Sequence, residues 1–187
     1  MIGFALCGSF CTVRSALVEM EKLTVAHEVQ GIVSETVYST NTRFALATDV
    51  IDEIKQLTGK EVIHSIVGAE PLGPKSPLEA LVICPCTGNT LAKMANGITD
   101  TAVTMAAKAH LRSDRPLVIA LASNDALSAN LKNIGQMLTR KNVYFVPMKQ
   151  DDPMEKPHSL VADFALLAPT LQAALAGKQY QRLFVIS

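Results

Sequence analysis

Small polar residues follow one of the longest apolar runs in this sequence, and their types suit either a turn or a bound ligand. The run at residues 81–84 (Leu-Val-Ile-Cys) ends at Pro85 and continues as Cys86-Thr87-Gly88-Asn89-Thr90. Hydroxyl and amide groups can hold a ligand through donated and accepted hydrogen bonds. The same residue types also cap helices and form turns, so both interpretations stay open.

Similar polar groups follow three other apolar runs, whereas charged residues are few at these positions. Together they give the candidate ligand-binding residues Gly8, Ser9, Phe10, Ser34, Thr36, Pro85, Thr87, Asn89, Thr90, Ser123 and Asn124. A Gly-Ser pair ahead of a helix can bind an anion through free backbone N–H groups. The chain has neither a G-x-G-x-x-G fingerprint nor a Walker motif. Neutral donors beside a helix terminus suit a planar phosphorylated ligand such as flavin mononucleotide (FMN), and no residue stands out as a catalytic acid or base.

Short apolar runs alternate with amphipathic stretches along the chain. Strands are predicted at 2–7, 28–33, 61–67, 80–84, 116–122 and 143–146, and helices at 13–23, 46–57, 90–111, 127–138 and 160–176. Gly59 and Gly177 are expected to end their helices. Residues 90–111 are expected to break near Gly97, with Thr99 or Asp100 capping the second piece. Pro169 would start or kink the second half of the last helix.

The remaining segments have loop character. Residues 68–77 contain three prolines and two glycines, and residues 149–157 are charged and expected to be exposed or mobile. The apolar residues 183–186 have no role that the pattern assigns. The alternation predicts a single α/β domain over 1–187, a three-layer doubly wound parallel sheet of the flavodoxin-like or Rossmann-like kind. Ligands of such sheets bind beyond the carboxyl ends of the strands, so the polar groups should converge there.

Composition excludes several function classes. The chain has 187 residues with 17 basic and 17 acidic side chains, and it has no basic cluster that would favour nucleic acid. No apolar run is long enough to span a bilayer, and the start does not look like a secretion signal, which favours the cytoplasm. The four cysteines are spaced C-x₃-C and C-x-C, so buried thiols are favoured over a four-thiolate metal site.

Residues 85–100 resemble the P-A-S/T-A-N-T…K-x-A-x-G-I-A-D signature of the flavin-containing cysteine decarboxylase superfamily, which includes phosphopantothenoylcysteine decarboxylase. Gly8-Ser9 and Ser34 lie where that superfamily has its first phosphate-side loop and a hydroxyl after the second strand. Residues 122–125, 130–131 and 146–147 resemble its A-M-N…N-I…P block. The resemblance covers most of 1–150 and implies a flavoprotein-type fold, an FMN site and a homo-oligomer.

Two departures from the superfamily pattern concern catalysis. The decarboxylases carry an active-site histidine at the position of Pro71, and this chain has none between Ser65 and Pro85. His64 lies seven residues too early, so a structural or rim role is favoured for it over acid–base chemistry. Gly88 replaces the usual alanine, and the smaller residue is expected to open backbone room that alters or abolishes flavin binding.

Within the superfamily, the whole chain is similar to the smaller component of a two-component oxidoreductase of sporulating bacteria. Residues 3–12, 84–90 and 156–163 carry this similarity. It implies an NADP-binding partner (the A subunit of that enzyme), a small dicarboxylate substrate whose dihydropyridine ring is oxidised, and the cytoplasm of the mother cell. Two alternatives remain: a non-catalytic scaffold that has lost its flavin, and an FMN-dependent decarboxylase of a cysteinyl substrate.

Overall fold

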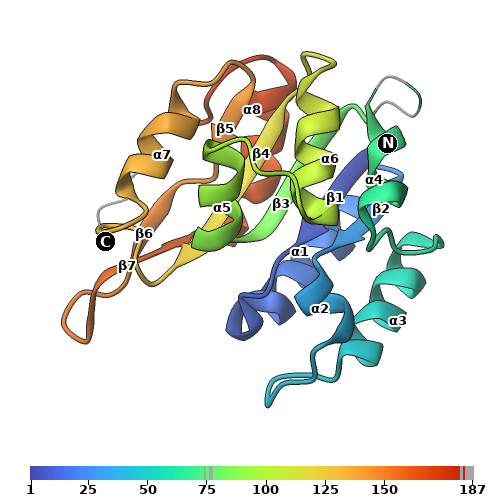
Figure 1. Ribbon diagram of the computed structural model, residues 1–187, viewed down its shortest axis with the longest axis horizontal. Coiled ribbons are helices and arrows are strands. Elements are labelled where there is room, and N and C mark those ends of the chain that lie inside the picture. Colours follow the sequence, from blue (N-terminus) through green and yellow to red (C-terminus); the bar gives the residue numbers. More distant parts are fainter. Residues whose placement is uncertain (74, 76–77, 182, 184–187) are drawn as a thin grey trace.

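The computed structural model describes residues 1–73, 75, 78–181 and 183, and it is built on a seven-stranded sheet (Figure 1). Five strands run parallel in the order β2-β1-β3-β4-β5, which is the flavodoxin-like order. Their bounds are β1 (Ile2–Leu6), β2 (Val29–Val33), β3 (Ala80–Thr87), β4 (Leu117–Ser123) and β5 (Val143–Phe145). The doubly wound α/β fold predicted from the alternating pattern is thus confirmed.

Helices cover both faces of the sheet, which explains why its central strands are apolar throughout. On one face α5 contacts α6 and α7, and on the other α1 contacts α8 (Figure 1). The helices are α1 (Val13–Thr24), α2 (Glu35–Ser39), α3 (Ala47–Thr58), α4 (Ile66–Ala69), α5 (Gly88–Ala95), α6 (Ala102–Leu111), α7 (Leu131–Leu138) and α8 (Leu167–Leu175), with short 3₁₀ turns η1 (Phe10–Thr12), η2 (Glu70–Leu72) and η3 (Phe164–Leu166). No helix among the described residues is long and apolar enough to cross a membrane.

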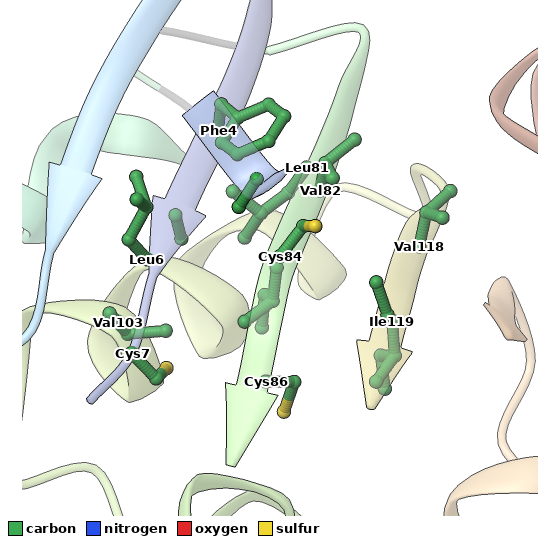
Figure 2. Close-up of a cluster of buried hydrophobic side chains, with 14 of the residues drawn as sticks. Phe4, Leu6, Cys7, Leu81, Val82, Cys84, Cys86, Val103, Val118 and Ile119 are labelled. Atoms are coloured by element: carbon green, nitrogen blue, oxygen red, sulfur yellow. The ribbon is translucent and has the colours of Figure 1, made fainter. Parts of the chain in front are cut away.

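The centre of the core lies between β1, β3 and β4. Figure 2 shows Phe4, Leu81 and Val118 among the side chains packed there, and all three are fully buried. Strands covered on both faces need apolar side chains at successive positions rather than at alternate ones. β4 meets this condition from Leu117 to Ala122, and β1 meets it at every position except Gly3, which fixes the backbone frame from which the strand-end loops project.

The outer edge of the sheet is antiparallel, which the sequence pattern did not reveal. β6 (Met148–Asp152) and β7 (Lys156–Ala162) form a hairpin, and β7 pairs antiparallel with β4 at Ala122 and Ser123. Residues 149–157 are largely exposed as expected, and they form the outer part of the β6–β7 hairpin. The helix predicted over 160–176 is wrong in its first part, because residues 160–162 belong to β7. Pro169 lies in the first turn of α8, where its missing N–H costs nothing.

Other boundaries also differ from the prediction. Residues 61–67 form no strand; a single bridge joins Ile63 to Ile32, and the Ser65 hydroxyl then accepts from the Gly68 N–H and starts α4. β3 continues through Pro85 to Thr87, beyond the predicted end at Cys84. Residues 124–130 are a turn, so the predicted helix at 127 begins only at Leu131. Of the tail, residues 184–186 lie outside the described residues, and Leu183 packs against the core.

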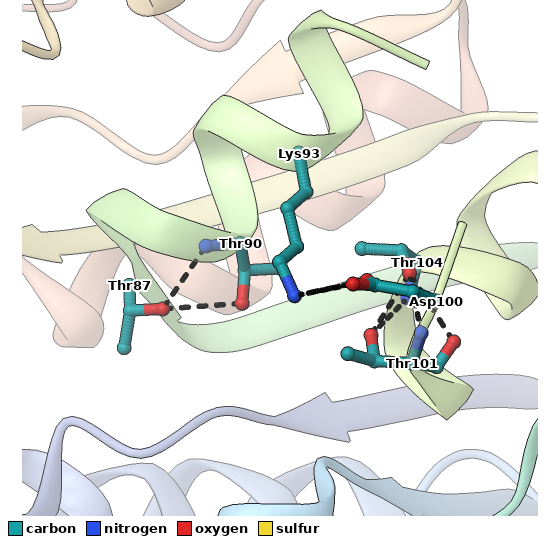
Figure 3. Close-up of polar contacts among 6 residues, drawn as sticks. All are labelled: Thr87, Thr90, Lys93, Asp100, Thr101 and Thr104. Carbon is teal, nitrogen blue, oxygen red and sulfur yellow. Dashed lines mark hydrogen bonds and ion pairs between the residues drawn. The ribbon is translucent and has the colours of Figure 1, made fainter. Parts of the chain in front are cut away.

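The break between α5 and α6 confirms the predicted interruption near Gly97, whose φ is +74°. Thr101 caps α6, rather than Thr99 or Asp100: Thr101 and Thr104 exchange side-chain and backbone hydrogen bonds in a capping box (Figure 3). Lys93 of α5 reaches both carboxylate oxygens of Asp100 at 2.9 Å and so ties the two helices together (Figure 3). Gly59 and Gly177 have positive φ and end α3 and α8 as predicted.

Candidate ligand-binding site

The carboxyl ends of β1, β3 and β4 open onto a cavity of about 1160 Å³. Strand order reverses between β1 and β3, because the chain leaves β1 toward β2 on one side and later adds β3 on the other. The loops after these two strands therefore diverge and leave a crevice at this point of the sheet. Of the predicted ligand-binding residues, those that line the cavity are Gly8, Ser9, Phe10, Thr87, Asn89, Ser123 and Asn124.

The loop after β1 forms one wall of the cavity. Ser9 donates its N–H to the Cys7 carbonyl at 2.8 Å, and the Thr12 hydroxyl donates to the Ser9 carbonyl at 2.9 Å. These bonds close the loop into the η1 turn that leads into α1. A Cβ on Gly8 would lie 3.3 Å from the Thr36 methyl and 3.5 Å from the Phe10 ring. The glycine therefore lets the loop pass close to α2 while its backbone faces the cavity.

The loop after β3 caps a helix and also lines the cavity, while its binding of a ligand stays a prediction. Thr87 is the N-cap of α5: its hydroxyl oxygen accepts from the Thr90 N–H at 3.2 Å, and its hydroxyl donates to Thr90 Oγ1 at 3.1 Å (Figure 3). Thr90 is buried and is not among the residues that line the cavity. Asn89 stays exposed on the first turn of α5 and lines the cavity. Its amide and that of Asn124, on the neighbouring loop, form no hydrogen bond within the described residues.

Asp125 organises the loop after β4. Its carboxylate accepts from the Ser123 hydroxyl at 2.5 Å and from the Asn130 amide at 2.9 Å, and the Asn130 oxygen accepts from Asn133 at 2.8 Å. The Asp125 carbonyl also accepts from the backbone N–H of Asn130. The hydrogen bonds from Ser123 and Asn130 lower the pKa of Asp125 below its usual value, so the group is a fixed negative charge at neutral pH.

This cluster explains the unusual Gly88. A Cβ at position 88 would lie 2.6 Å from Asn130 Nδ2, 2.9 Å from Asp125 Oδ1 and closer still to Ser123 Oγ. The room that the glycine opens was expected to affect the flavin directly. In the structure the polar side chains of the β4–α7 loop fill this room, and the effect on a flavin stays a prediction. Gly88 thus serves the close packing of the two loops that present Asn89 and Asn124.

Several predicted residues lie outside the cavity lining. Ser34 caps α2 by accepting from the Val37 N–H, and Thr36 lies behind Gly8. Pro85 is buried within β3, where the cis bond from Cys84 accompanies a register shift against β4. Thr90 is buried, and its hydroxyl oxygen accepts a hydrogen bond from the Thr87 hydroxyl. His64 stacks on the Tyr38 ring at 3.8 Å and is not among the lining residues.

Sequence reasoning missed three contributions to the cavity. Arg43 lies 4.8 Å above the Phe44 ring and brings a guanidinium to the rim from the loop before α3. Lys132 lines the wall formed by the start of α7. The β6–β7 hairpin adds the Asp151–Lys156 ion pair at 2.6 Å. Arg43 directly follows a polar stretch after β2, and this signal could have placed it beside the cavity. The sequence pattern carried no such signal for the hairpin, which reaches the cavity through pairing of β7 with β4.

The cysteines divide into three buried thiols and one exposed thiol. Burial raises the pKa of Cys7 to about 11 and also raises the pKa values of Cys84 and Cys86, so these groups stay protonated. Cys11 is exposed and lines the cavity. Among the described residues no group of three or more His, Cys, Asp or Glu side chains is placed to hold a metal ion.

Comparison with known proteins agrees with the fold. The model of the flavoprotein family matches residues 1–165. The B subunit of dipicolinate synthase from Bacillus subtilis is 46% identical over 185 residues, 98% of this chain and 92% of that protein. The chain belongs to the flavoprotein family. The crystal structure of the corresponding B subunit from Bacillus halodurans superposes on this flavoprotein-family chain with a TM-score of 0.91 at 45% identity, covering 99% of this chain and 95% of the other.

More distant neighbours share the fold alone. The FMN-dependent cysteine decarboxylase SpaF has a TM-score of 0.69 at 22% identity, covering 94% of each chain. A UbiX protein in complex with FMN and dimethylallyl pyrophosphate has a TM-score of 0.61 at 18% identity, covering 78% of this chain and 76% of the other. The decarboxylase-type Rossmann-like fold expected for this flavoprotein-family chain is therefore confirmed.

Proposed function

We propose that this chain is the B subunit of a dipicolinate synthase and that its cavity binds a planar ring carrying anionic groups. The observation that carries the proposal is the pair of free amides, Asn89 and Asn124, presented from adjacent strand ends into one cavity. An amide offers a donor and an acceptor side by side, which suits the edge of a nitrogen heterocycle. The similarity to the Bacillus subtilis protein over 98% of the chain supports the choice of substrate.

The charges of the cavity fit a dicarboxylate. Arg43 and Lys132 line it, and neither belongs to an ion pair among the described residues, whereas Lys156 is already paired with Asp151. The Asp125 carboxylate accepts hydrogen bonds from Ser123 and Asn130, so its negative charge is stabilised by groups of its own loop. Two cations on different walls can each bind one carboxylate of the substrate, and the Ser9 hydroxyl adds a neutral donor.

The reaction is the oxidation of dihydrodipicolinate to dipicolinate, which removes a hydride and a proton from the ring. The hydride passes to NADP on the A subunit, and the proton passes to solvent or a nearby base. The chain has no dinucleotide fingerprint of its own, so its residues bind and orient the ring while the partner supplies the nicotinamide.

FMN is the other ligand of the same chemical class, and the cavity fits it in volume and in neutral donors. Gly8, Ser9 and the N–H groups of the η1 turn would receive its phosphate, and Asn89 with Asn124 would meet the ring edge. A bound flavin would supply a hydride acceptor within this chain.

The proposal also includes a homo-oligomer and a location in the cytoplasm of the mother cell. One structural neighbour is a dodecameric FMN-dependent UbiX-like decarboxylase, which supports the homo-oligomer.

The decisive experiment combines an absorbance titration with FMN and a turnover assay with the A subunit, dihydrodipicolinate and NADP. Asn89→Ala should weaken binding of the true ligand about tenfold, because one of its two ring-edge contacts is lost. Gln172→Ala, on an exposed position of α8 outside the cavity lining, is the control and should change nothing.

Each outcome has a distinct meaning. A flavin spectrum that weakens in Asn89→Ala places FMN in the cavity. Indifference to FMN together with a raised KM for dihydrodipicolinate in Asn89→Ala assigns the cavity to the dicarboxylate. A chain that ignores FMN and leaves the turnover of the NADP-binding partner unchanged would refute the proposal and favour the non-catalytic scaffold. Release of carbon dioxide from a cysteinyl peptide would favour the decarboxylase.

A further inference from the structure

A second hollow, of about 360 Å³, lies between the end of α5, the start of the turn after it, α6 and the end of α7. Its walls are apolar: Met94 and Ala107 are buried beside it, Leu111 is partly buried, and Ile98 is 47% exposed at its mouth. Gly97, with φ of +74°, turns the chain so that Ile98 follows at the edge of the hollow. A volume of this size matches the lower range of small-molecule sites, roughly 300–1,000 Å³.

Three cations line the hollow without an acidic side chain among the lining residues. Lys108 lies in the last turn of α6, Arg112 is the C-cap residue of that helix, and Arg140 comes from the segment after α7. All three are exposed, and the ion pairs of the described residues involve other cations. In a chain with equal numbers of acidic and basic residues, this is a local excess of positive charge.

Two acidic side chains near these cations in the sequence, Asp100 and Asp114, already form ion pairs with other lysines. Asp100 binds Lys93 through both oxygens, and Asp114 binds Lys141 at 2.9 Å. Thr104, the buried hydroxyl of the hollow, is used in the capping box with Thr101. Recognition here therefore rests on apolar area and positive charge, with few directional neutral groups.

We propose that this hollow is a binding site for a small aromatic carboxylate. The ring would lie against Met94, Ile98 and Leu111, and the carboxylate would meet Lys108, Arg112 and Arg140. Burying a planar ring releases water from the apolar walls, and the cations compensate the charge that a purely apolar hollow would reject. A neutral ring of the same size gains only the first contribution, so the site discriminates by charge.

The site is separate from the large cavity. α5 stands between them: Asn89, Ala92 and Asn96 line the cavity, whereas Met94 and Gly97 line the hollow. The two share no lining residue, and the smaller volume favours a single ring over a flavin nucleotide. The proposal therefore stands or falls independently of the function proposed for the cavity.

The absence of tryptophan from the sequence allows a clean optical test. Ile98→Trp places a single fluorophore at the mouth of the hollow, and benzoate, pyridine-2,6-dicarboxylate and neutral benzamide are titrated against it. Saturable quenching by the two anions, with benzamide at least about tenfold weaker, is the expected result. In the same background Arg140→Ala should weaken the anions about fivefold, and added salt should do likewise.

Lys141→Ala is the matched control, because Lys141 neighbours Arg140 in sequence but pairs with Asp114. Equal responses to benzoate and benzamide, or equal effects of Arg140→Ala and Lys141→Ala, would overturn the proposal. A tryptophan signal that depends on protein concentration and ignores all three ligands would also overturn it, and would assign the hollow to contact with a second copy of the chain. Equilibrium dialysis of benzoate against the chain with Ile98 retained, with and without Arg140→Ala, gives the same comparison if the tryptophan variant does not fold.

Discussion

Gly88 and Asp125 depend on each other, although they come from different loops. The carboxylate of Asp125, the hydroxyl of Ser123 and the amide of Asn130 fill the space beside Gly88 that a larger residue would need. Only an ionised carboxylate can accept all the hydrogen bonds that converge here without having to donate one. A glycine at one position and an aspartate at the other therefore form one structural unit at the contact between the loops that carry Asn89 and Asn124.

Gly88→Ala should lower both stability and ligand affinity. The new methyl would lie 2.6 Å from Asn130 Nδ2, and its neighbours are held by mutual hydrogen bonds, so we expect a cost of about 1–3 kcal/mol. Gly135→Ala is the control: a Cβ there meets nothing within 4 Å, and in the interior of α7 alanine should stabilise by about 0.5–1 kcal/mol. Urea unfolding of both variants tests this, and an unchanged midpoint for Gly88→Ala would contradict it.

Asp125→Asn should destabilise the protein in a pH-dependent way. The folded pKa of Asp125 is lowered by its hydrogen bonds, so its contribution is present above the unfolded value of about 4 and is lost as pH falls through the lower folded value. We expect a cost of about 1 kcal/mol near neutral pH, modest because the group is partly exposed, that shrinks toward acid. Asp52→Asn, exposed on α3, is the control. A cost that stays constant with pH would show that shape, rather than charge, matters at this position.

Among the secondary-structure elements, α5 connects the site to the rest of the molecule. It begins at Thr87 beside the cavity, is tied to the turn before α6 by the Lys93–Asp100 pair, and ends at the second hollow. The sequence predicted it as the first part of a helix over 90–111 that breaks near Gly97. The hairpin β6–β7, in contrast, has an apolar end at residues 160–162 that also fits a helical pattern, and only pairing with β4 makes it a strand.

The two helix caps should separate stability from binding. Thr87→Ala and Thr101→Ala each remove a side-chain acceptor from a helix N-terminus, so each should cost about 1 kcal/mol of unfolding free energy. Only Thr87 lines the cavity, so only Thr87→Ala should also weaken the ligand identified for Asn89. Thermal unfolding together with the ligand titration measures both. A similar loss of affinity in Thr101→Ala would mean that affinity follows global stability.

At the scale of the whole molecule, the rate at which the buried thiols react measures how often the core becomes exposed to solvent. Cys7, Cys84 and Cys86 lie in the central core of the sheet shown in Figure 2, are fully or almost fully buried, and have raised pKa values. The thiolate is the reactive form, so iodoacetamide should modify only Cys11 in the native protein and all four cysteines after denaturation. Intact mass measured over time tests this. Rapid modification of a second cysteine under native conditions would show that the core opens locally.

The fold was readable from the sequence because its signals are local. Continuous apolar runs identify strands covered on both faces, Gly59 and Gly177 end helices by a backbone conformation that glycine adopts freely, and polar residues at 87–90 and 123–124 mark strand ends. The strand predicted at residues 61–67 was wrong because a strand needs a partner along its length, and β2 meets this segment only at Ile63.

The candidate site was readable only in part. Hydroxyls and amides at the strand ends could be named from the sequence, as Asn89 and Asn124 were, but the direction of each side chain could not. The Thr90 hydroxyl is hydrogen-bonded to Thr87 and does not line the cavity. The Asp125 carboxylate occupies the space beside Gly88, which has no side chain. Local pattern was enough to establish the parallel sheet and the edge at which a ligand should bind. Which residues reach the cavity depends on contacts between loops and on the pairing of β7 with β4, and these join segments far apart along the chain, so only the folded molecule could settle them.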